Sequence, residues 1–169
     1  MASQDPAPIT IRSFCAADAE ACKRLYHEGI LGGQLAENDT GLDIDDIENS
    51  YMKVPGNHFW VAQLPDGQVV GTIGVQHHET GEGEVRRLRV QQDYRRRGIG
   101  SRLMEAAVKF CAEQQYLKIT LDTFVDREPA VRLFEKFRFR HNRTRKVGER
   151  DLLYFYLDIY GTDRKENEK

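Results

Sequence analysis

Alternation of apolar and polar residues predicts most of the β-strands in this chain. The segment "ITIRSF" (residues 9–14) alternates along its length, as a strand with one buried face does. The β-rich runs "HFWVAQL" and "VVGTIGVQHH" flank the turn "PDGQ" and predict a hairpin. Further strands are predicted at "EVRRLRV", at the mostly apolar "LKITLDTF", and at "FRHNRTRKV" and "RDLLYFYLDI", which are joined by the turn "GE".

Helical periodicity marks four segments between these strands. Asp18 is expected to cap the first helix, and a second helix is expected over about residues 43–53. The third spans about residues 99–115, and Asp126 is expected to cap the fourth. The predicted order is β-α-α-β-β-β-α-β-α-β-β, an α/β (α+β) chain in which a strand–helix–strand unit is set into an otherwise antiparallel sheet.

Length and composition narrow the picture to an ordinary folded domain. The chain of 169 residues fits one domain. We expect a flexible arm at residues 1–8, one domain at 9–160 and a charged, disordered tail at 161–169. The sequence has no secretory signal and no apolar run near the ~20 residues of a membrane span, so we predict a cytoplasmic protein, with the nucleus as a second location and no membrane partner.

Charge and cysteine content argue against nucleic-acid binding, a disulfide framework and a metal site. The formal net charge of −2 and the lack of an interleaved aromatic platform argue against a nucleic-acid partner. Cys15, Cys22 and Cys111 are too few and too scattered for a disulfide framework or a metal site, so we predict no metal. The sequence does not fix the oligomeric state, and a homodimer is left open.

The stretch "YRRRGIG" (residues 94–100) lies between a predicted strand ending at Val90 and a predicted helix. A helix start offers unpaired N–H groups and a positive dipole end, and Gly98 and Gly100 let a phosphate approach the backbone. The spacing differs from the dinucleotide fingerprint, and the P-loop lysine is missing, which argues against NAD and ATP hydrolysis. A pyrophosphate site and a plain tight turn both fit these residues.

The spacing Arg95-x-x-Gly98-x-Gly100 resembles the acyl-CoA signature of the GCN5-related N-acetyltransferases, the GNAT family. The stretch "EVRRLRVQQDYRRRGIGSRLM" is similar to that family's fourth strand, loop and third helix, and the resemblance covers about residues 9–158. It implies a mixed, mostly antiparallel sheet of about seven strands with about four helices, whose fourth and fifth strands splay to hold acetyl-CoA. It also implies direct acetyl transfer to a primary amine on a small molecule, an amino acid or conjugate, or a peptide.

The resemblance assigns cofactor contacts to the fourth strand and the loop. The N–H of Val90 would polarise the thioester carbonyl and hold its developing oxyanion. Main-chain N–H groups of the loop would hold the pyrophosphate, with the arginines in support. The implied cofactor-binding residues are Leu88, Arg89, Val90, Arg95, Arg96, Arg97, Gly98, Ile99, Gly100 and Ser101.

Transfer to an amine needs a base near the attack site, because only the neutral amine attacks. Some members of the family place a glutamate where this chain has Glu84, so Glu84 is a candidate base, acting through a water. His77 and His78, at the end of the preceding strand, are alternatives because histidine titrates near neutral pH. An exposed, purely structural role remains open for all three.

The family's thiolate-protonating tyrosine is missing, because "AVRLFEKFRF" carries Phe134 at that position. The thiolate could leave unprotonated, or Tyr154 or Tyr156 could donate the proton; Tyr154 is the candidate we favour. The third reading is an acyl-CoA-binding sensor or a catalytically degenerate domain.

A narrower resemblance links "DIENSYMKVPGNHFWVAQLPDGQVVGTIGV" and "ITLDTF" to the camello-like branch, which includes the cysteine-S-conjugate and aspartate N-acetyltransferases. Those relatives carry a hydrophobic membrane segment where this chain has the polar loop "GGQLAENDTGLD", which implies a soluble member. In this fold, the acceptor is selected by positions equivalent to residues 29–42, Arg86 with Arg87, and 140–153. The basic hairpin could attract a carboxylate or simply be a solvated edge.

Overall fold

The computed structural model describes residues 8–28 and 39–160, and within them the chain forms four α-helices and seven strands. The predicted order of elements is confirmed. The α-helices are α1 (Ala19–Glu28), α2 (Leu42–Asp45), α3 (Ile99–Glu113) and α4 (Glu128–Lys136). The strands are β1 (Thr10–Ser13), β2 (His58–Gln63), β3 (Val69–His78), β4 (Glu82–Val90), β5 (Lys118–Phe124), β6 (Arg140–Val147) and β7 (Arg150–Asp158). Short 3-10 turns at Ala16–Asp18 and Gln92–Tyr94 and a π-helical turn at Glu48–Met52 complete the list.

The strands form a mixed sheet with the hydrogen-bonded order β1-β2-β3-β4-β5-β7-β6. The β1–β2, β2–β3, β5–β7 and β6–β7 ladders are antiparallel. The β4–β5 ladder is parallel and joins Glu82–Glu84 to Lys118–Thr120. This ladder confirms the predicted strand–helix–strand unit and the mostly antiparallel sheet. The splay that would hold acetyl-CoA stays a prediction.

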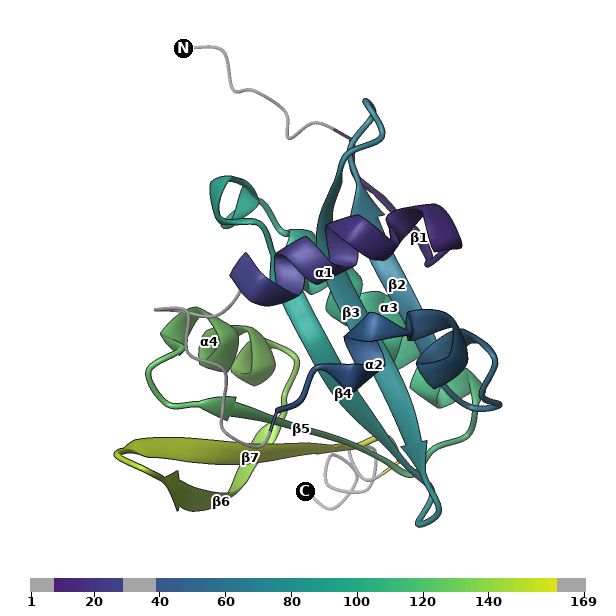
Figure 1. The fold of residues 1–169 in the computed structure, drawn as a ribbon. Coiled ribbons are helices and arrows are strands. Elements are labelled where there is room, and N and C mark those ends of the chain that lie inside the picture. The colour runs from purple at the N-terminus through teal and green to yellow at the C-terminus, as the bar shows by residue number, and fades with distance from the viewer. Residues whose placement is uncertain (1–7, 29–38, 161–169) are drawn as a thin grey trace. The chain divides into compact units, whose positions relative to one another are not determined.

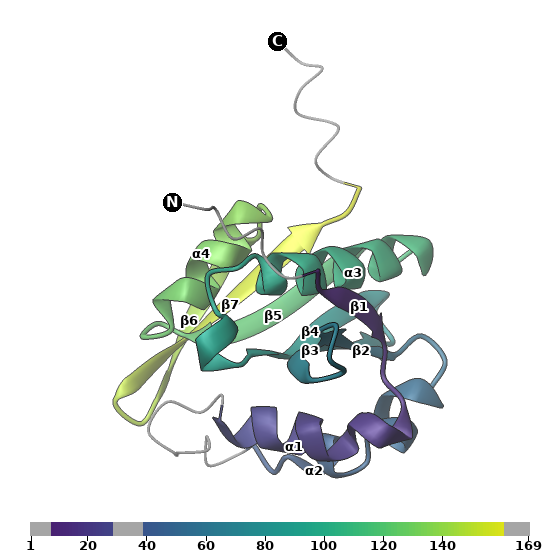
Figure 2. The same cartoon turned by 90° about the horizontal axis from the view of Figure 1, so that it is seen from above.

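The chain divides into two compact units. The first contains Met1–Gln76 and Arg86–Ala107. In it, α1 and α2 lie on one side of β1–β3, and α3 lies on the other (Figure 2). Amphipathic periodicity buries one face of α1 through Cys22, Leu25 and Tyr26, which pack with residues of α2 and β2 into one apolar cluster.

The second unit contains His77–Val85 and Val108–Lys169. Its strands β5, β7 and β6 lie side by side, with α4 next to them (Figure 1). The ring of Phe134 on α4 packs edge-on against Phe155 of β7 and contacts Phe139. This aromatic cluster anchors α4, so Phe134 is a core residue.

Neither predicted aspartate is the N-cap residue of its helix, and each forms an ion pair with an arginine. Asp18 lies inside the 3-10 turn that precedes α1, where it accepts the Cys15 N–H and two hydrogen bonds from Arg12. The N-cap of α4 is Arg127, and Asp126 instead forms an ion pair with Arg150. Asp18 therefore still takes part in capping, as the N3 residue of a capping box whose N-cap is Cys15, whereas at Asp126 the ion pair with Arg150 takes the place of the predicted cap.

The predicted helix over residues 43–53 is divided. Asp46 has φ −145°, outside the helical range, and separates α2 from the π-helical turn. Both carboxylate oxygens of Asp46 accept hydrogen bonds from Asn49, which gives the second segment its own start.

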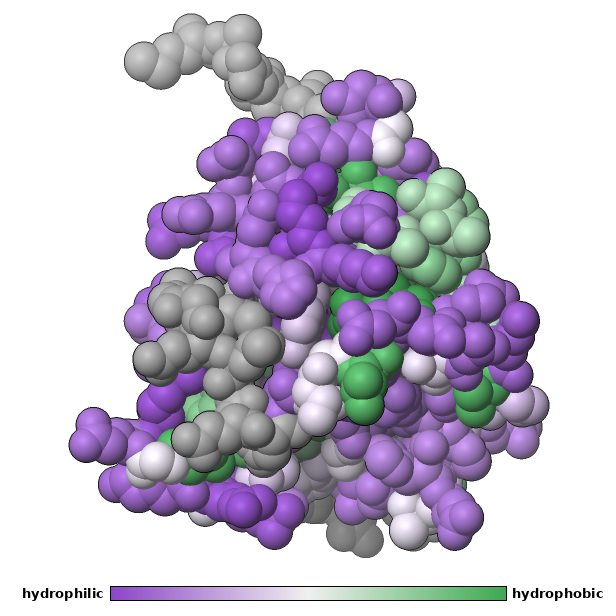
Figure 3. All heavy atoms as spheres, in the orientation of Figure 1, coloured by the Kyte–Doolittle hydropathy of each residue, from purple (hydrophilic) through white to green (hydrophobic). Residues whose placement is uncertain are grey.

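The surface residues of the protein are mostly polar, as expected when the apolar residues are buried. The face seen in Figure 3 is mostly hydrophilic, and its hydrophobic residues occur in separate small areas. Within the described part of the chain, no helix is long and apolar enough to cross a membrane. The expected acceptor loop falls mostly on residues 29–38, outside the described residues.

Candidate active site

A left-handed residue interrupts β4 just before the stretch predicted to contact the thioester. Arg87 has φ 58°, a conformation that residues with a Cβ rarely adopt within a strand. The hydroxyl of Thr72 on β3 donates to the Arg87 carbonyl at 2.8 Å and holds the backbone from one side. The following residues, Leu88, Arg89 and Val90, are half-buried.

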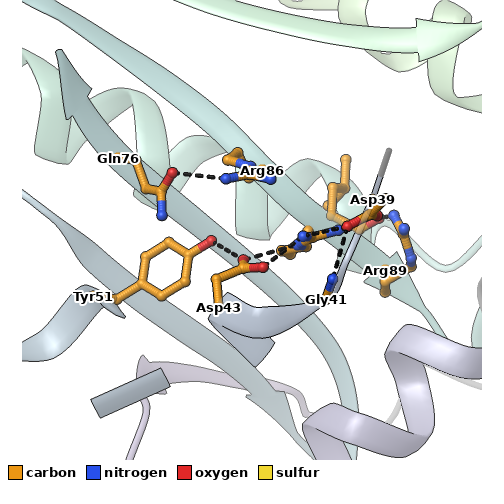
Figure 4. A network of polar contacts seen from close by, with 9 residues as sticks. Asp39, Gly41, Asp43, Tyr51, Gln76, Arg86 and Arg89 are labelled. Carbon is orange, nitrogen blue, oxygen red and sulfur yellow. Dashed lines mark hydrogen bonds and ion pairs between the residues drawn. The ribbon is translucent and has the colours of Figure 1, made fainter. Parts of the chain in front are cut away.

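The side chain of Arg87 lies between two carboxylates. Its Nη1 and Nη2 donate to Asp39 at 2.6 and 2.9 Å, and its Nε and Nη2 donate to Asp43 at 2.9 and 2.6 Å. Asp43 also accepts from the Tyr51 hydroxyl at 2.6 Å, and Asp39 accepts the Gly41 N–H (Figure 4). We call Asp39, Asp43, Tyr51 and Arg87 the Arg87 clamp.

Electrostatics keep the clamp charged. Burial raises the pKa of Asp39, but the hydrogen bonds and charge of Arg87 outweigh it and lower that pKa to about 2. Burial also raises the pKa of Asp43, but the hydrogen bonds from Arg87 and Tyr51 outweigh this effect and bring that pKa below its usual value. The guanidinium of Arg87 is nearly buried, yet the two carboxylates raise its pKa. Two anions and one cation therefore leave the clamp with one net negative charge at neutral pH.

Arg86, the preceding residue, is half-buried and donates to Gln76 on β3 at 2.8 Å (Figure 4). Its charge also contributes to the lowered pKa of Asp43. The expectation that Arg86 and Arg87 share an accessible acceptor surface is corrected for Arg87, which is 8% exposed with its guanidinium bound by carboxylates.

The glycine loop follows β4 with a second left-handed turn. Arg96 and Gly98 have φ of 62° and 77°, and a Cβ at Gly98 would meet no atom within 4 Å. The loop is closed by its own side chains, because Arg95 Nε donates to the Val90 carbonyl at 3.1 Å and Arg97 lies over the Tyr94 ring. Arg95, Arg96, Arg97 and Gly98 are all exposed.

Helix α3 begins directly after the loop and is anchored by Ile99, which is 1% exposed. The first helical bond runs from the Arg102 N–H to the Gly98 carbonyl at 3.1 Å. Gly100 and Ser101 lie in the first turn and are half-buried. The first N–H groups of a helix have no intrahelical acceptor and carry the positive end of its dipole, so this turn suits an anion.

Two of the candidate bases are bonded to each other in the second unit. His78 Nε2 lies 2.7 Å from Glu84 Oε2, and both side chains are partly exposed. His77 instead stacks on the Tyr116 ring, with centroids 5.0 Å apart. Glu84 and His78 therefore form one hydrogen-bonded pair, where the sequence presented two separate candidates.

Both candidate proton donors lie on β7 next to a cation. Arg143 lies over the Tyr154 ring at 4.3 Å from the centroid, and Lys118 lies near the Tyr156 ring at 5.4 Å. Both tyrosines are half-buried. Cys111 is fully buried, and burial raises its thiol pKa to about 12, which leaves it a poor nucleophile. Residues 8–28 and 39–160 hold no cluster of three or more His, Cys, Asp or Glu suited to a metal.

Sequence reasoning missed the Arg87 clamp. The available signal was in "EVRRLRV", where alternation puts Arg87 and Arg89 on the same parity as the buried Val85. A buried arginine needs anionic partners. Those partners lie 44 and 48 residues away in sequence, beyond the reach of any local pattern.

Comparison with known proteins places these features in a family. A family model described as "Acetyltransferase (GNAT) family" matches residues 22–139. Among curated proteins, the chain is 35% identical over 111 residues to a probable N-acetyltransferase camello of Xenopus tropicalis, covering 64% of this chain and 50% of the relative. It is 38% identical over 100 residues to N-acetylaspartate synthetase of the same species, covering 59% of this chain and 36% of the relative.

Among solved structures, an acetyltransferase of the GNAT family from Staphylococcus aureus superposes with a TM-score of 0.77 at 21% identity. The match covers 89% of this chain and 99% of the other. The chain thus spans half or less of the two curated relatives but almost all of this structure.

Proposed function

Because the chain belongs to the acetyltransferase (GNAT) family, we propose that it is an N-acetyltransferase that moves an acetyl group from acetyl-CoA to a primary amine. The observation that carries the proposal is the junction of β4, the exposed glycine loop and the start of α3. Gly98 lies there in a left-handed conformation with open space at its Cβ position. A backbone of this kind admits a phosphate to main-chain N–H groups.

Each part of this junction has a role in the proposal. Main-chain N–H groups from Arg95 to Ser101 bind the pyrophosphate. Leu88 to Val90 contact the pantetheine arm, and the Val90 N–H polarises the thioester carbonyl. The contacts of Arg95 and Arg97 within the loop support the view that these side chains shape the loop more than they bind the ligand. No metal has a part in this scheme.

Proton transfer is assigned to the second unit. Glu84, paired with His78, accepts the proton of the acceptor ammonium, directly or through water. Tyr154 is the proposed donor to the departing thiolate. The neutral amine then attacks the thioester carbon, the C–S bond breaks, and the sulfur takes the Tyr154 proton and leaves as thiol. The proton that the new amide nitrogen loses passes through water to the tyrosinate and restores Tyr154.

The acceptor class follows from the relatives and from surface charge. One similar protein is named N-acetylaspartate synthetase, so its product is an acetylated amino acid. The exposed strand β6 carries Arg140, Arg143, Arg145 and Lys146. We propose an amino acid or amino-acid conjugate whose carboxylate is attracted to such cations. A cytoplasmic location remains a prediction.

The direct test measures free CoA after the protein is mixed with acetyl-CoA and one amine at a time. The panel holds amino acids, S-substituted cysteines, a diamine and a lysine peptide. Cys15 is an exposed thiol, so Cys15→Ser protein is used with a thiol-reactive dye. Release with any acceptor supports the enzyme; tight CoA binding without release supports the sensor, the alternative that Phe134 favours.

The base is tested by the pH–rate profile of Glu84→Gln. Loss of a general base lowers kcat by about 100-fold or more and removes the acidic limb of the profile. Glu79→Gln, an exposed change in the preceding turn, is the matched control and keeps the native profile. An unaltered profile in Glu84→Gln would remove Glu84 from this role.

A further inference from the structure

We propose that Arg87 is a positioning residue for acetyl transfer: held by Asp39 and Asp43, it fixes the left-handed turn of β4 and so the direction of the N–H groups of Leu88 to Val90. The inference rests on the proposed function, which assigns the thioester contact to these N–H groups. Arg87 itself touches neither the cofactor nor the acceptor in this scheme.

The backbone of Arg87 calls for an explanation of its own. Glycine is the usual residue at a φ of 58°, because a Cβ is strained there. Here the position carries a large side chain, so other contacts must stabilise the strained turn. The hydroxyl of Thr72 holds the Arg87 carbonyl, and the two carboxylates hold the guanidinium. Both ends of the residue are therefore fixed.

The bonding pattern requires arginine. The guanidinium makes four hydrogen bonds to two carboxylates, all between 2.6 and 2.9 Å, with the side chain 6% exposed. A lysine ammonium has three donors on one atom and cannot match two carboxylates in this planar arrangement. Both carboxylates come from the chain after α1, so the clamp ties residues 39–43 to β4.

The turn changes which way the following residues point. In a regular strand, neighbouring side chains lie on opposite faces. Here burial alternates regularly from Gly83 to Arg87, but the three residues after the left-handed Arg87 are all half-buried. The strand therefore leaves its regular alternation after Arg87, as it does at a β-bulge. Without the clamp, β4 can relax toward regular pleating, which would rotate the N–H groups of Leu88 to Val90.

The test compares Arg87→Ala with Arg12→Ala. Arg12 also lies in the first unit and also makes a two-pronged ion pair with a buried carboxylate, at 2.8 Å to each oxygen of Asp18. Each variant loses a bidentate arginine–carboxylate pair, of which Arg87 makes two and Arg12 makes one, but only Arg87 belongs to β4. For Arg87→Ala we expect kcat to fall about 30- to 100-fold, with the KM for acetyl-CoA within about threefold, because small misplacements affect the transition state most. Arg12→Ala keeps the native kcat.

A second measurement does not depend on activity. Amide hydrogen exchange of Leu88 to Val90 in the free protein should accelerate at least about tenfold in Arg87→Ala and stay native in Arg12→Ala. Arg87→Lys should resemble Arg87→Ala in both readouts. If Arg87→Ala does not fold, Asp39→Asn removes one arm of the clamp while keeping its shape, and it should give smaller changes in the same direction.

Two results would overturn the inference. The first is a native exchange rate at Leu88 to Val90 in the Arg87 variants. The second is a loss of kcat no larger than that of Arg12→Ala, which would make the clamp a general stabilising contact. A wild-type protein that releases no CoA with any acceptor would instead contradict the proposed function, and the exchange result would still decide whether the clamp holds β4.

Discussion

Arg87 and Arg96 have almost the same left-handed φ, 58° and 62°, in opposite surroundings. Arg87 is 8% exposed, and its side chain is bound by two carboxylates. Arg96 is exposed and lies in the loop before α3. At position 87 the side chain stabilises the backbone. At position 96 the loop backbone is the feature proposed to bind the ligand, and the side chain is secondary.

The two positions show two different ways to maintain a left-handed backbone turn. A buried turn has to be held by specific partners, because desolvated charges are costly when unpaired. An exposed turn needs only residues that tolerate its conformation, because water satisfies the rest. Substitutions that change side-chain charge or hydrogen bonding should therefore disturb the clamp. Substitutions that strain the backbone or fill the space beside it should disturb the loop.

The largest expected effect tests the loop side of this comparison. Gly98→Val adds a β-branched side chain at φ 77°, where it strains the loop and occupies the open space proposed for the phosphate. We expect CoA affinity, measured by calorimetry, to fall on the order of 100-fold, since strain of a few kcal/mol combines with lost phosphate access.

Gly148→Val is the control for Gly98→Val. Gly148 has φ 63° and equally open space, but it lies in the turn between β6 and β7. It reproduces the backbone strain and should leave CoA affinity native. Equal losses of affinity in the two variants would mean that strain alone, rather than phosphate access, explains the result.

The next largest effect is the contribution of the Arg87 clamp to the free energy of unfolding, which should depend on pH. Because Arg87 lowers the pKa of Asp39 to about 2, the ionised carboxylate stabilises the fold above its unfolded pKa of about 3.9. That stability is lost as pH falls through the folded value. Asp39→Asn should thus cost about 1–2 kcal/mol in urea unfolding at neutral pH, and its difference from wild type should shrink between about pH 4 and pH 2.

Asp126→Asn supplies the contrast for this measurement. Asp126 also has a pKa lowered by an arginine, Arg150, but its side chain is 53% exposed. Solvent screens such pairs, so the pH-dependent difference should be clearly smaller. A pH-independent cost of Asp39→Asn would show that the Asp39 charge does not stabilise the clamp.

The same contrast explains which features the sequence could predict. Apolar patterning located most strands of the described residues and the long helix α3, because burial of alternate residues or of one helix face is a local property. The exposed strand β6 was predicted from its turn to β7 instead. The glycine loop was found because glycines and a helix start stand next to each other in the chain. The predicted caps differ from the structure because Asp18 is the N3 residue of a capping box and also pairs with Arg12, and because Asp126 pairs with Arg150.

Arg87 shows the limit most clearly. Its left-handed φ is unexpected for arginine, and both its partners belong to a segment that reads as a polar loop. The Glu84–His78 bond is a milder case, because a β-hairpin brings the two residues together across a short turn. In both cases the missing information was which polar groups meet, which hydrophobic patterning does not encode.

The smallest expected effect is that of Arg96→Gly, and it is the sharpest test of the comparison. Glycine adopts φ 62° without strain, so the substitution keeps the turn and removes only an exposed side chain. We expect CoA affinity within about fivefold of wild type and a change in unfolding free energy within about 0.5 kcal/mol. Arg87→Gly relieves the same backbone strain but leaves two half-buried carboxylates without their cation, so it should cost about 2–3 kcal/mol. If the two glycine variants were equally mild, the side chain of Arg87 would not be what holds β4.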